Sequence, residues 1–452
     1  MRQSDKEQRK NKYFGTDGFR GEYGRELTDA HAEAIGQFLG SRPVGGVAKI
    51  LIGRDTRWSS HPLENALVRG ITSVGGEAYL LGVCPTPALS YITSEGGYDA
   101  AVMITASHNP AKDNGIKIFH KNGEKLPDEI IALCEDFIDR KPWMDEKQGR
   151  VIHLPHGAEI WEKWLVSSSE RLCGLRIGLD CANGATYEAA AKIFSSLGAE
   201  VHTIGCQPDG YNINEGLGST HPERLARTVV ELGLDMGFAF DGDGDRCIAI
   251  DSDGKIIDGD SEMYILASGM LRSGELKNNT VVATIMSNSG FVRALSDLGI
   301  TCLRTPVGDR FVSEKMRQCK AMLGGEQSGH LIIGSTTGGD GIYTALRLAA
   351  EVKKRGMPLG ALVGNMTLYP QITESIRIKS RESVLADKHL WDIIKLTEDE
   401  IGDRGRILLR PSGTENLIRL MVEHENQDIC KQYIAKISKI IKDRSEQQKN
   451  EN

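Results

Sequence analysis

The strongest constraint on the fold of this chain is a strand, helix and strand plan that occurs three times. Its copies span residues 48–82, 175–205 and 280–306. In each copy an apolar run of strand length passes through a polar turn into a helical pattern, and a glycine precedes a second apolar run. Two strands joined by a helix form the unit that builds parallel sheets. The sequence therefore predicts three similar α/β domains with mixed sheets.

Each copy is followed by a second helix and a short strand that enters a glycine-rich or polar loop. The three junctions read AAVMITASHNP (100–110), MGFAFDGDGDR (236–246) and AMLGGEQSGH (321–330). Open α/β sheets bind ligands at the carboxyl ends of their strands, so we expect each domain to present one loop to a functional site. Chance similarity between strand–helix–strand units is the alternative. The unusual loop at the same place in each unit favours a true repeat.

A different pattern follows residue 370, with expected strands at 372–378, 406–410 and 416–423 and expected helices at 384–396 and 429–441. This pattern is typical of a smaller C-terminal α+β domain. A chain of 452 residues has room for several domains of about 100–150 residues each. The predicted domain boundaries are 10–153, 154–252, 253–368 and 369–445.

Composition excludes several classes of function. The net charge of −7 provides no basic field, so we expect no nucleic-acid or membrane partner. No apolar run approaches the ~20 residues that span a bilayer, and the polar N-terminus does not resemble a secretory signal. Nine cysteines without a Cys-x-x-Cys pair are typical of reduced thiols. A cytoplasmic protein is expected.

The segment DGDGDR (241–246) is the sharpest chemical signal. Asp241, Asp243 and Asp245 form a crowded set of hard oxygen ligands, which needs a cation near neutral pH. The segment is not an EF-hand loop, because Arg246 occupies the position of the turn glycine and Ser252 that of the bidentate glutamate. A surface Asp-Gly turn is the plain alternative. We interpret the cluster as a Mg²⁺ site shared with a phosphate.

The segment TASHNP (105–110) places Ser107 beside His108. A hydrolase dyad is one interpretation, but no Gly-x-Ser-x-Gly elbow surrounds the serine, and adjacent side chains do not automatically meet. A simple Ser/Asn turn is another. Together with a magnesium cluster, the serine hydroxyl makes chemical sense as a phosphoryl acceptor. Arg20 and Lys117 add candidate cations for a phosphate, and lowering of the Lys117 pKa would suit it to proton transfer.

Two further loops have ligand-binding composition. In GGEQSGH (324–330), Glu326 and Ser328 suit sugar hydroxyls, and His330 suits proton transfer near neutral pH, although a structural histidine is the alternative. In RPSGTEN (410–416), a guanidinium, two hydroxyls and a glycine suit one phosphate, although a hairpin turn is the alternative. A basic loop, GDR (308–310), lies between them.

These loops together resemble the α-D-phosphohexomutase superfamily from residue 14 to about residue 441. The segments FGTDGFRG (14–21), TASHNP, DGDGDR, GGEQSGH and RPSGTE occur in the family's order and at similar spacing. Glutamine in the sugar loop and VGDRFVSEKM (307–316) look most like the phosphoglucosamine mutase branch. The resemblance implies four domains around a central cleft and a phosphorylated Ser107. It also implies interconversion of glucosamine 6-phosphate and glucosamine 1-phosphate.

The resemblance implies one Mg²⁺ per active site and a hexosamine 1,6-bisphosphate as intermediate and activator. The expected partner is a small hexose phosphate, and a homodimer is left open. The implied catalytic residues are Ser107, His108, Lys117, Arg20, Arg246 and His330. The implied metal ligands are Ser107, Asp241, Asp243 and Asp245. The implied substrate-binding residues are Gly308, Asp309, Arg310, Glu326, Ser328, Arg410, Ser412, Gly413, Thr414 and Arg419.

Two residues depart from the family pattern. Asn416 replaces a usual proline, and Thr105 replaces a common serine. Neither change removes a reacting group, so they bear on the substrate more than on the mechanism. A phosphomannomutase or phosphoglucomutase is the main rival. A sugar-phosphate-binding regulator without turnover and a phosphatase are the other two, and the phosphate loop argues against the phosphatase.

Overall fold

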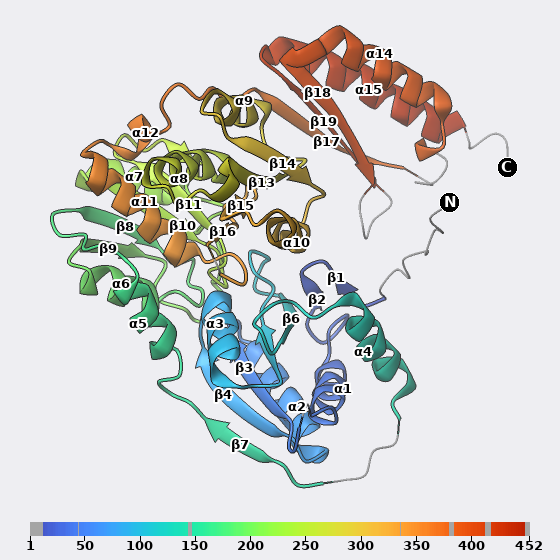
Figure 1. Cartoon of the computed structure of the whole chain (residues 1–452). Helices are drawn as coiled ribbons and strands as arrows, with labels where there is room; N and C mark the ends of the chain where they lie inside the picture. Colours follow the sequence, from blue (N-terminus) through green and yellow to red (C-terminus); the bar gives the residue numbers. More distant parts are fainter. Residues whose placement is uncertain are drawn as a thin grey trace. The chain divides into compact units, whose positions relative to one another are not determined.

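The computed structural model describes residues 12–43, 45–142, 147–334, 336–378, 384–411 and 417–447. Contacts divide the chain into two compact units, residues 1–286 with 298–364 and residues 287–297 with 365–452. Among the described residues, the first unit contains three sheets and the second contains one (Figure 1). None of the helices in these ranges combines the length and apolar character needed to cross a membrane.

The first sheet has the strand order β1-β2-β6-β5-β3-β4-β7. Its strands are β1 (Phe14–Gly15), β2 (Gly18–Glu22), β3 (Lys49–Arg54), β4 (Glu77–Val83), β5 (Ala100–Ile104), β6 (Asp113–His120) and β7 (Arg150–His153). Strand β3 pairs in parallel with β4 and β5, and β6 returns antiparallel to β5. The loop that carries Ser107, residues 105–112, is called the serine loop below. It connects the fully buried parallel strand β5 to the antiparallel strand β6.

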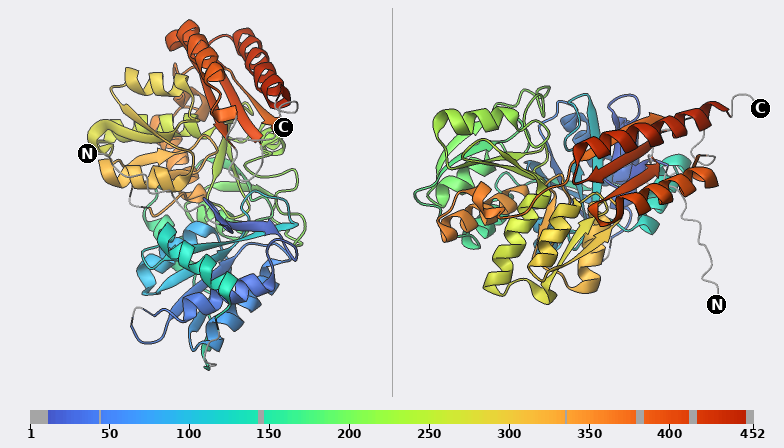
Figure 2. Two further views of the ribbon diagram at one scale, coloured as in Figure 1. Left: turned by 90° about the vertical axis from the view of Figure 1, so that its right-hand side faces the viewer. Right: turned by 90° about the horizontal axis from the view of Figure 1, so that it is seen from above.

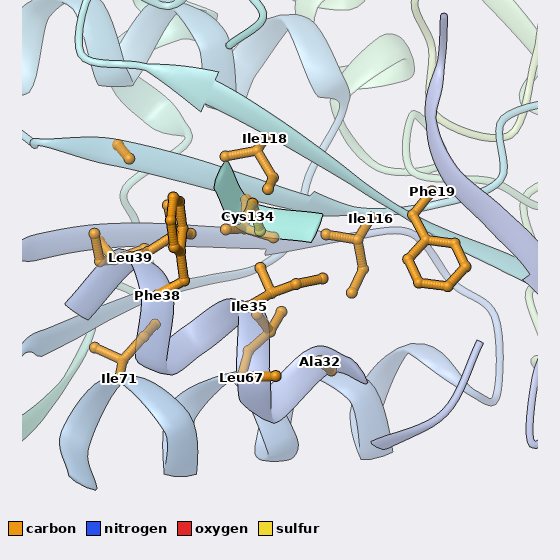
Figure 3. Packing of buried hydrophobic residues seen from close by; sticks show 14 of the residues in the cluster. Phe19, Ala32, Ile35, Phe38, Leu39, Leu67, Ile71, Ile116, Ile118 and Cys134 are labelled. Carbon is orange, nitrogen blue, oxygen red and sulfur yellow. The ribbon is translucent and has the colours of Figure 1, made fainter. Parts of the chain in front are cut away.

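Helices cover both faces of this sheet. Helices α1 (Asp29–Gly40), α2 (Ser60–Ser73) and α4 (Asp128–Arg140) share one buried cluster with the strands, while α3 (Thr86–Gly96) packs separately on β3 and β5. Figure 3 shows Ile35, Phe38 and Leu67 facing Ile116 and Ile118 across this cluster. Helices α1 and α2 approach closely at Gly70, where a Cβ atom would lie 2.0 Å from the Glu33 carbonyl oxygen.

The second sheet has the order β12-β11-β10-β8-β9. Its strands are β8 (Arg176–Asp180), β9 (Glu200–Ile204), β10 (Met236–Phe240), β11 (Cys247–Asp251) and β12 (Ile256–Ile257), and α5 (Glu159–Ser167), α6 (Ala189–Ser196) and α7 (Glu223–Leu232) occur in the same part of the chain. Strand β8 pairs in parallel with β9 and β10, and β11 returns antiparallel to β10. The DGDGDR loop is the connection from β10 to β11.

The third sheet has the order β14-β13-β15-β16. Its strands are β13 (Thr280–Thr284), β14 (Thr301–Thr305), β15 (Leu323–Gly325) and β16 (Leu331–Ile333). The same unit also contains α8 (Gly259–Ser273), α10 (Asp309–Cys319), α11 (Gly341–Arg355), α12 (Leu359–Leu362) and the 3₁₀ turn Lys277–Asn279. Strand β13 pairs in parallel with β14 and β15, and β16 returns antiparallel to β15.

One strand order therefore occurs three times, as β4-β3-β5-β6, β9-β8-β10-β11 and β14-β13-β15-β16. In every case the polar loop lies between the last parallel strand and the returning antiparallel strand. This arrangement confirms the predicted fold class of three similar α/β domains with mixed sheets. The repeat is real, and it places the three loops at equivalent positions of their sheets.

The second unit is the smaller α+β part of the chain. It contains α9 (Ser289–Asp297), β17 (Gln371–Arg377), α14 (Lys388–Ile401), the 3₁₀ turn Gly402–Arg404, β18 (Gly405–Pro411), β19 (Leu417–His424) and α15 (Gln427–Gln447). Helices α14 and α15 bury one apolar cluster against the antiparallel β17-β19-β18 sheet (Figure 2). The helix expected at 384–396 begins later, because Asp387 caps it by accepting from the His389 and Leu390 N–H groups.

Candidate active site

The serine loop and the aspartate loop meet. Ser107 Oγ donates a hydrogen bond to Asp241 Oδ2 at 2.6 Å, and both side chains are buried. The Ser107 N–H donates to Thr105 Oγ1 at 2.9 Å, so threonine at this position supplies the hydroxyl acceptor that a serine would supply. His108 Nδ1 lies 3.4 Å from Ser107 Oγ. Of these contacts, the sequence predicted the one between the Ser107 loop and the aspartate loop, which come from separate motifs.

Gly242 permits this meeting. A Cβ atom at that position would lie 2.5 Å from the Ser107 carbonyl oxygen and 2.9 Å from Asn214 Nδ2. Real Cβ atoms do not approach backbone atoms so closely. The glycine between the first two aspartates therefore lets the backbone of one loop lie against the backbone of the other.

The aspartates form a compact buried cluster. One oxygen from each of Asp241, Asp243 and Asp245 lies within 4.8 Å of the others. No described residue donates a hydrogen bond to Asp243 Oδ1 or Asp245 Oδ1, although both atoms are buried. Burial, with repulsion from Asp245 and Asp243, raises the pKa of Asp241 to about 8. Buried carboxylate oxygens that receive no hydrogen bond from the described residues fit, at this spacing, a hard divalent cation, which would favour the ionised form.

Lys117 lies beside the cluster. Its Nζ atom donates to Asp243 Oδ2 at 2.6 Å and to Asp245 Oδ2 at 3.1 Å. Burial favours the neutral amine, but the two carboxylates outweigh it and raise the pKa of Lys117 above its usual value. The expectation of a lowered Lys117 pKa is therefore wrong in this arrangement. The paired carboxylates hold the amine as a cation.

Three other predicted residues, Arg20, Arg246 and His108, lie close to the serine and aspartate loops. Arg20 and Arg246 each have a buried Nε donor without a hydrogen-bond acceptor among the described residues. Arg246 Nε lies 4.0 Å from Asp241 Oδ2, and Arg20 pairs with Asp17 at 3.5 Å. Burial, with the charges of Arg246 and Arg20, lowers the pKa of His108 to about 4. The surroundings of Ser107 therefore include guanidinium groups and a neutral imidazole, which suit a bound oxyanion.

The predicted sugar loop lies between β15 and β16. Glu326 Oε1 accepts a hydrogen bond from the Gly308 N–H at 2.9 Å, which connects this loop to the GDR segment. Ser328 Oγ is buried and has no hydrogen-bond partner among the residues that the structure describes. A buried hydroxyl without a partner is costly unless a ligand supplies one.

His330 links the sugar loop to the aspartate cluster. Its Nδ1 atom lies 3.7 Å from Asp245 Oδ1, and its Nε2 atom lies 3.7 Å from Asp309 Oδ2. Burial opposes protonation, but Asp245, Asp309 and Glu326 raise the pKa of His330 to about 9. The Gly339 N–H, which donates to Nε2 at 3.0 Å, favours the neutral ring instead. Full charges outweigh one neutral donor, so we take His330 to be cationic near neutral pH.

The GDR segment contacts residues of the first sheet's helical layer and loops. Lys125 Nζ donates to Asp309 Oδ1 at 2.8 Å and to Asp17 Oδ1 at 3.0 Å, so it links this segment to the turn that precedes β2, the strand that carries Arg20. Arg310 forms an ion pair with Asp128. The predicted substrate-binding side chains of Asp309 and Arg310 thus have protein partners in this structure.

The RPSGTE loop belongs to the second unit. Arg410 on β18 and Arg419 on β19 are directly opposite one another in the antiparallel ladder. Side chains of opposite residues extend from the same face, and two like charges there repel each other. Ser412, Gly413, Thr414 and the departure Asn416 lie outside the described residues.

Sequence reasoning missed three residues that bind the two loops. Thr86, at the start of α3, donates from Oγ1 to Asp243 Oδ2 at 2.5 Å and from its N–H to the Asp243 carbonyl at 2.9 Å. Arg57 and Asn214 bind the serine loop from two other segments. Arg57 follows β3 at the same sheet edge as Ser107, and this position is a weak sequence signal for a role at the site. The sequence around Thr86 and Asn214 gives no such signal.

A cavity of about 270 Å³ adjoins this cluster within the first unit. Lys117, Asp245 and His330 line part of its wall, and Tyr91 and Trp164 line another part. The two aromatic rings stack with their centroids 4.9 Å apart. Ser107 does not line this cavity.

Comparison with known proteins identifies the family. Models described as phosphoglucomutase/phosphomannomutase match at residues 11–143 (alpha/beta/alpha domain I), 156–254 (domain II), 258–369 (domain III) and 373–440 (C-terminal domain). The chain is 46% identical over 447 residues to a phosphoglucosamine mutase of Bacillus cereus (strain AH187), which covers 95% of this chain and 98% of the relative.

Two solved structures show the same fold. A phosphoglucomutase/phosphomannomutase family protein from Burkholderia thailandensis superposes with a TM-score of 0.81 at 24% identity, covering 95% of this chain and 97% of that one. An Aspergillus fumigatus N-acetylphosphoglucosamine mutase in complex with GlcNAc-6P and magnesium superposes with a TM-score of 0.66 at 15% identity, covering 96% of each chain. With four matching domain models and a curated relative aligned over nearly its whole length, this chain belongs to the phosphoglucomutase/phosphomannomutase family.

Proposed function

We propose that this chain is an isomerase that interconverts glucosamine 6-phosphate and glucosamine 1-phosphate, with Ser107 as the phosphoryl carrier. One observation carries the proposal: Ser107 Oγ lies 2.6 Å from Asp241 in a buried carboxylate cluster. The substrate follows the name of the Bacillus cereus relative, to which the chain is 46% identical. The domain boundaries predicted at 10–153, 154–252, 253–368 and 369–445 remain part of this proposal.

The proposed cycle begins with phosphorylated Ser107. The bond between the serine oxygen and phosphorus breaks, and a new bond forms between a sugar hydroxyl oxygen and phosphorus. The product of this half-reaction is a hexosamine 1,6-bisphosphate and a free serine hydroxyl. In the second half-reaction Ser107 takes the other phosphoryl group, so the enzyme ends phosphorylated and the sugar carries its phosphate on the other oxygen.

The groups that would hold the transferred phosphoryl are Arg20 and Arg246, whose buried Nε donors have no hydrogen-bond acceptor among the described residues. Guanidinium groups bind phosphate oxygens through charge-assisted hydrogen bonds. Asp241, Asp243 and Asp245 would hold a Mg²⁺ ion, which neutralises phosphate charge when bound. These residues together suit the transfer of a dianionic group.

Proton transfer must accompany each half-reaction. The attacking hydroxyl loses a proton, and the departing oxygen gains one, so the proton count is unchanged over the step. In the second half-reaction neutral His108, which lies 3.4 Å from Ser107 Oγ, would accept the serine proton, and protonated His330 would donate one to the departing sugar oxygen. In the first half-reaction the same transfers would run in reverse, so His330 would accept the sugar hydroxyl proton and His108 would return one to the serine oxygen. Lys117, which the aspartates hold as a cation, would offset charge on the phosphoryl group.

Substrate recognition is assigned to two loops. Glu326 and Ser328 would bind sugar hydroxyls, and the unpartnered Ser328 Oγ supports this role. Arg410, Ser412, Gly413, Thr414 and Arg419 would bind the phosphate that is not reacting. The opposed guanidinium groups of Arg410 and Arg419 support that role, because an anion between them would offset their repulsion.

The deciding experiment compares initial rates with glucosamine 1-phosphate, glucose 1-phosphate and mannose 1-phosphate in the presence of Mg²⁺. We expect the largest kcat/KM for glucosamine 1-phosphate. Intact mass and peptide mapping should find one phosphate on the peptide that contains Ser107.

A clear preference for mannose or glucose 1-phosphate would move the chain to the phosphomannomutase or phosphoglucomutase branch. Turnover by an enzyme that stays unmodified at Ser107 would contradict the carrier mechanism itself. The mass measurement therefore separates an error in substrate from an error in mechanism.

A further inference from the structure

The backbone of Ser107 has a conformation that needs external support. Its φ angle is 54°, in the left-handed region that non-glycine residues rarely occupy. Such a residue keeps this conformation only when its surroundings fix it, and these residues concentrate at functional sites. The groups that fix Ser107 therefore determine where its hydroxyl points.

Arg57 is one of these groups. Four N–H groups of its fully buried guanidinium donate to carbonyl oxygens of the serine loop and of the first residue of β6, namely Ser107 (3.0 Å), Asn109 (2.8 Å), Pro110 (2.5 Å) and Asp113 (3.0 Å). Its Nε donates to Asp55 Oδ2 at 2.9 Å. All five donors of the side chain are thus in use, and none is available for a substrate.

Asn214 binds the same loop from a different part of the chain, between β9 and α7. Its Nδ2 atom donates to the carbonyl oxygens of Ser107 at 2.8 Å and Asn109 at 3.1 Å. Its own N–H donates to the Ala182 carbonyl, which follows β8 of the sheet that carries the aspartate loop. The Ser107 carbonyl therefore accepts one hydrogen bond from Arg57, which follows β3 of the first sheet. It accepts another from Asn214, which lies in the part of the chain that forms the second sheet.

We propose that Arg57 and Asn214 are positioning residues for the phosphoryl carrier, and that Asn214 aligns Ser107 with the carboxylates that follow β10. The proposal rests on the proposed function, since it concerns the same serine. Phosphoryl transfer depends on the alignment of donor and acceptor, so a small displacement of the serine oxygen slows the reaction strongly. Neither side chain is assigned to the sugar. Their loss should lower kcat and leave KM for the sugar phosphate nearly unchanged.

Asn214→Gly is the cleanest variant. Asn214 has a φ of 60°, which glycine adopts without strain, so the substitution removes the two hydrogen bonds and preserves the turn. Asn214→Asp keeps the shape but places carboxylate oxygens against the two carbonyl oxygens. Asn183→Gly is a matched control, because Asn183 is also buried with a positive φ of 49°. Among the described residues, its side chain bonds to Gln207 and Asn212 and not to the serine loop.

Three measurements test the proposal in the full-length enzyme with Mg²⁺. Steady-state rates should show kcat reduced by roughly tenfold or more in Asn214→Gly, further reduced in Asn214→Asp, and near wild type in Asn183→Gly. Phosphorylation of Ser107 by glucose 1,6-bisphosphate, followed by intact mass, should slow in parallel. Hydrogen exchange of residues 105–113 should accelerate in both Asn214 variants, while their melting temperatures match that of the control.

The positioning role is overturned if Asn214→Gly has the kcat of Asn183→Gly, or if its defect lies in KM. Unchanged exchange at residues 105–113 would also overturn it. If wild type and control fail to interconvert the sugar phosphates, the proposed function fails instead, and the exchange measurement still decides whether Asn214 holds the serine loop. Arg57→Lys serves as a second test, because three ammonium donors cannot replace the guanidinium's four bonds to carbonyls.

Discussion

Ser107 lies among charged groups whose protonation states differ sharply from those in water. Burial and the nearby guanidinium groups lower the pKa of His108 to about 4, whereas burial and its carboxylate neighbours raise the pKa of Asp241 to about 8. The imidazole is therefore neutral and Asp241 retains a proton near neutral pH until a cation binds.

The His108 shift predicts a specific pH dependence of stability. Between pH 6.5 and about 4, the unfolded chain binds a proton at this histidine and the folded chain does not, so the contribution of His108 to folding stability falls as pH falls through that window. Urea unfolding of dephosphorylated, EDTA-treated protein at pH 7.5 and 5.0 measures the loss. His108→Asn should lose less stability on acidification than wild type. The exposed His156 supplies a control, and His156→Asn should follow wild type.

Asp243 supplies a prediction for metal use. Its Oδ1 atom accepts no hydrogen bond from the described residues, and its Oδ2 atom is occupied by Thr86 and Lys117. Mutation of residues that only hydrogen-bond to metal ligands typically lowers metal affinity by about 10–100-fold. Loss of a ligand itself, in Asp243→Asn, should therefore raise the Mg²⁺ concentration for half-maximal activity by at least about tenfold. Magnesium titrations measure it, with exposed Asp253→Asn as control. An unchanged requirement would place the cation elsewhere.

At the scale of elements, each functional group depends on where a strand ends or pairs. The antiparallel register of β18 and β19 places Arg410 opposite Arg419. A hairpin built only for stability would not select two like charges at opposite positions. The register thus supports an anion site at this end of the ladder.

This register predicts the behaviour of Arg410→Ala. Weaker binding of the bisphosphate should let it escape before Ser107 is rephosphorylated, so activity should decline during turnover. Added glucose 1,6-bisphosphate should partly restore it. Progress curves, with Ser107 phosphate measured before and after, provide the readout. Arg377→Ala, at an exposed position of β17, is the control. A steady wild-type rate with Ser107 still phosphorylated would show that the RPSGTE loop is only a turn.

The sequence predicts those features that a local pattern determines. Apolar runs, glycine steps and polar loops located the three repeated units, and the Asp-Gly alternation located the carboxylate cluster. Arg57 and Asn214 were not predictable in this way, because their partners are carbonyl oxygens about 50 and 105 positions away in the chain. The direction of the Lys117 pKa shift was missed for a related reason. It depends on how closely two aspartates approach the amine, which no spacing in the sequence reveals.

At the scale of the whole molecule, the two units are interleaved in sequence, because the second unit takes residues 287–297 from the middle of the chain. Within that unit, buried Asn288 exchanges two hydrogen bonds with the Tyr369 backbone at 2.9 Å each, and the Ser289 N–H donates to Glu423 at 3.2 Å. The segment before α9 is thereby attached to the segment that enters β17.

This attachment predicts coupled opening. Asn288→Ala in the full-length chain should accelerate hydrogen exchange in α9 and in residues 365–369 together, because both lose the shared hydrogen bonds. Exchange in α10 should not change. Asn65→Ala, on the surface of α2, is the control and should leave all three segments as in wild type. Acceleration in α9 alone would show that the two segments open independently.

The way Arg57 binds the serine loop has a consequence for sequence variation. Its four bonds to the loop end on main-chain oxygens, which every amino acid provides. These hydrogen bonds therefore do not depend on which side chains occupy residues 109, 110 and 113. Substitution of those side chains would leave the four bonds from Arg57 in place, provided that the length of the loop and the path of its main chain stay the same. Arg57 therefore constrains the main chain of the serine loop without fixing the side chains around Ser107.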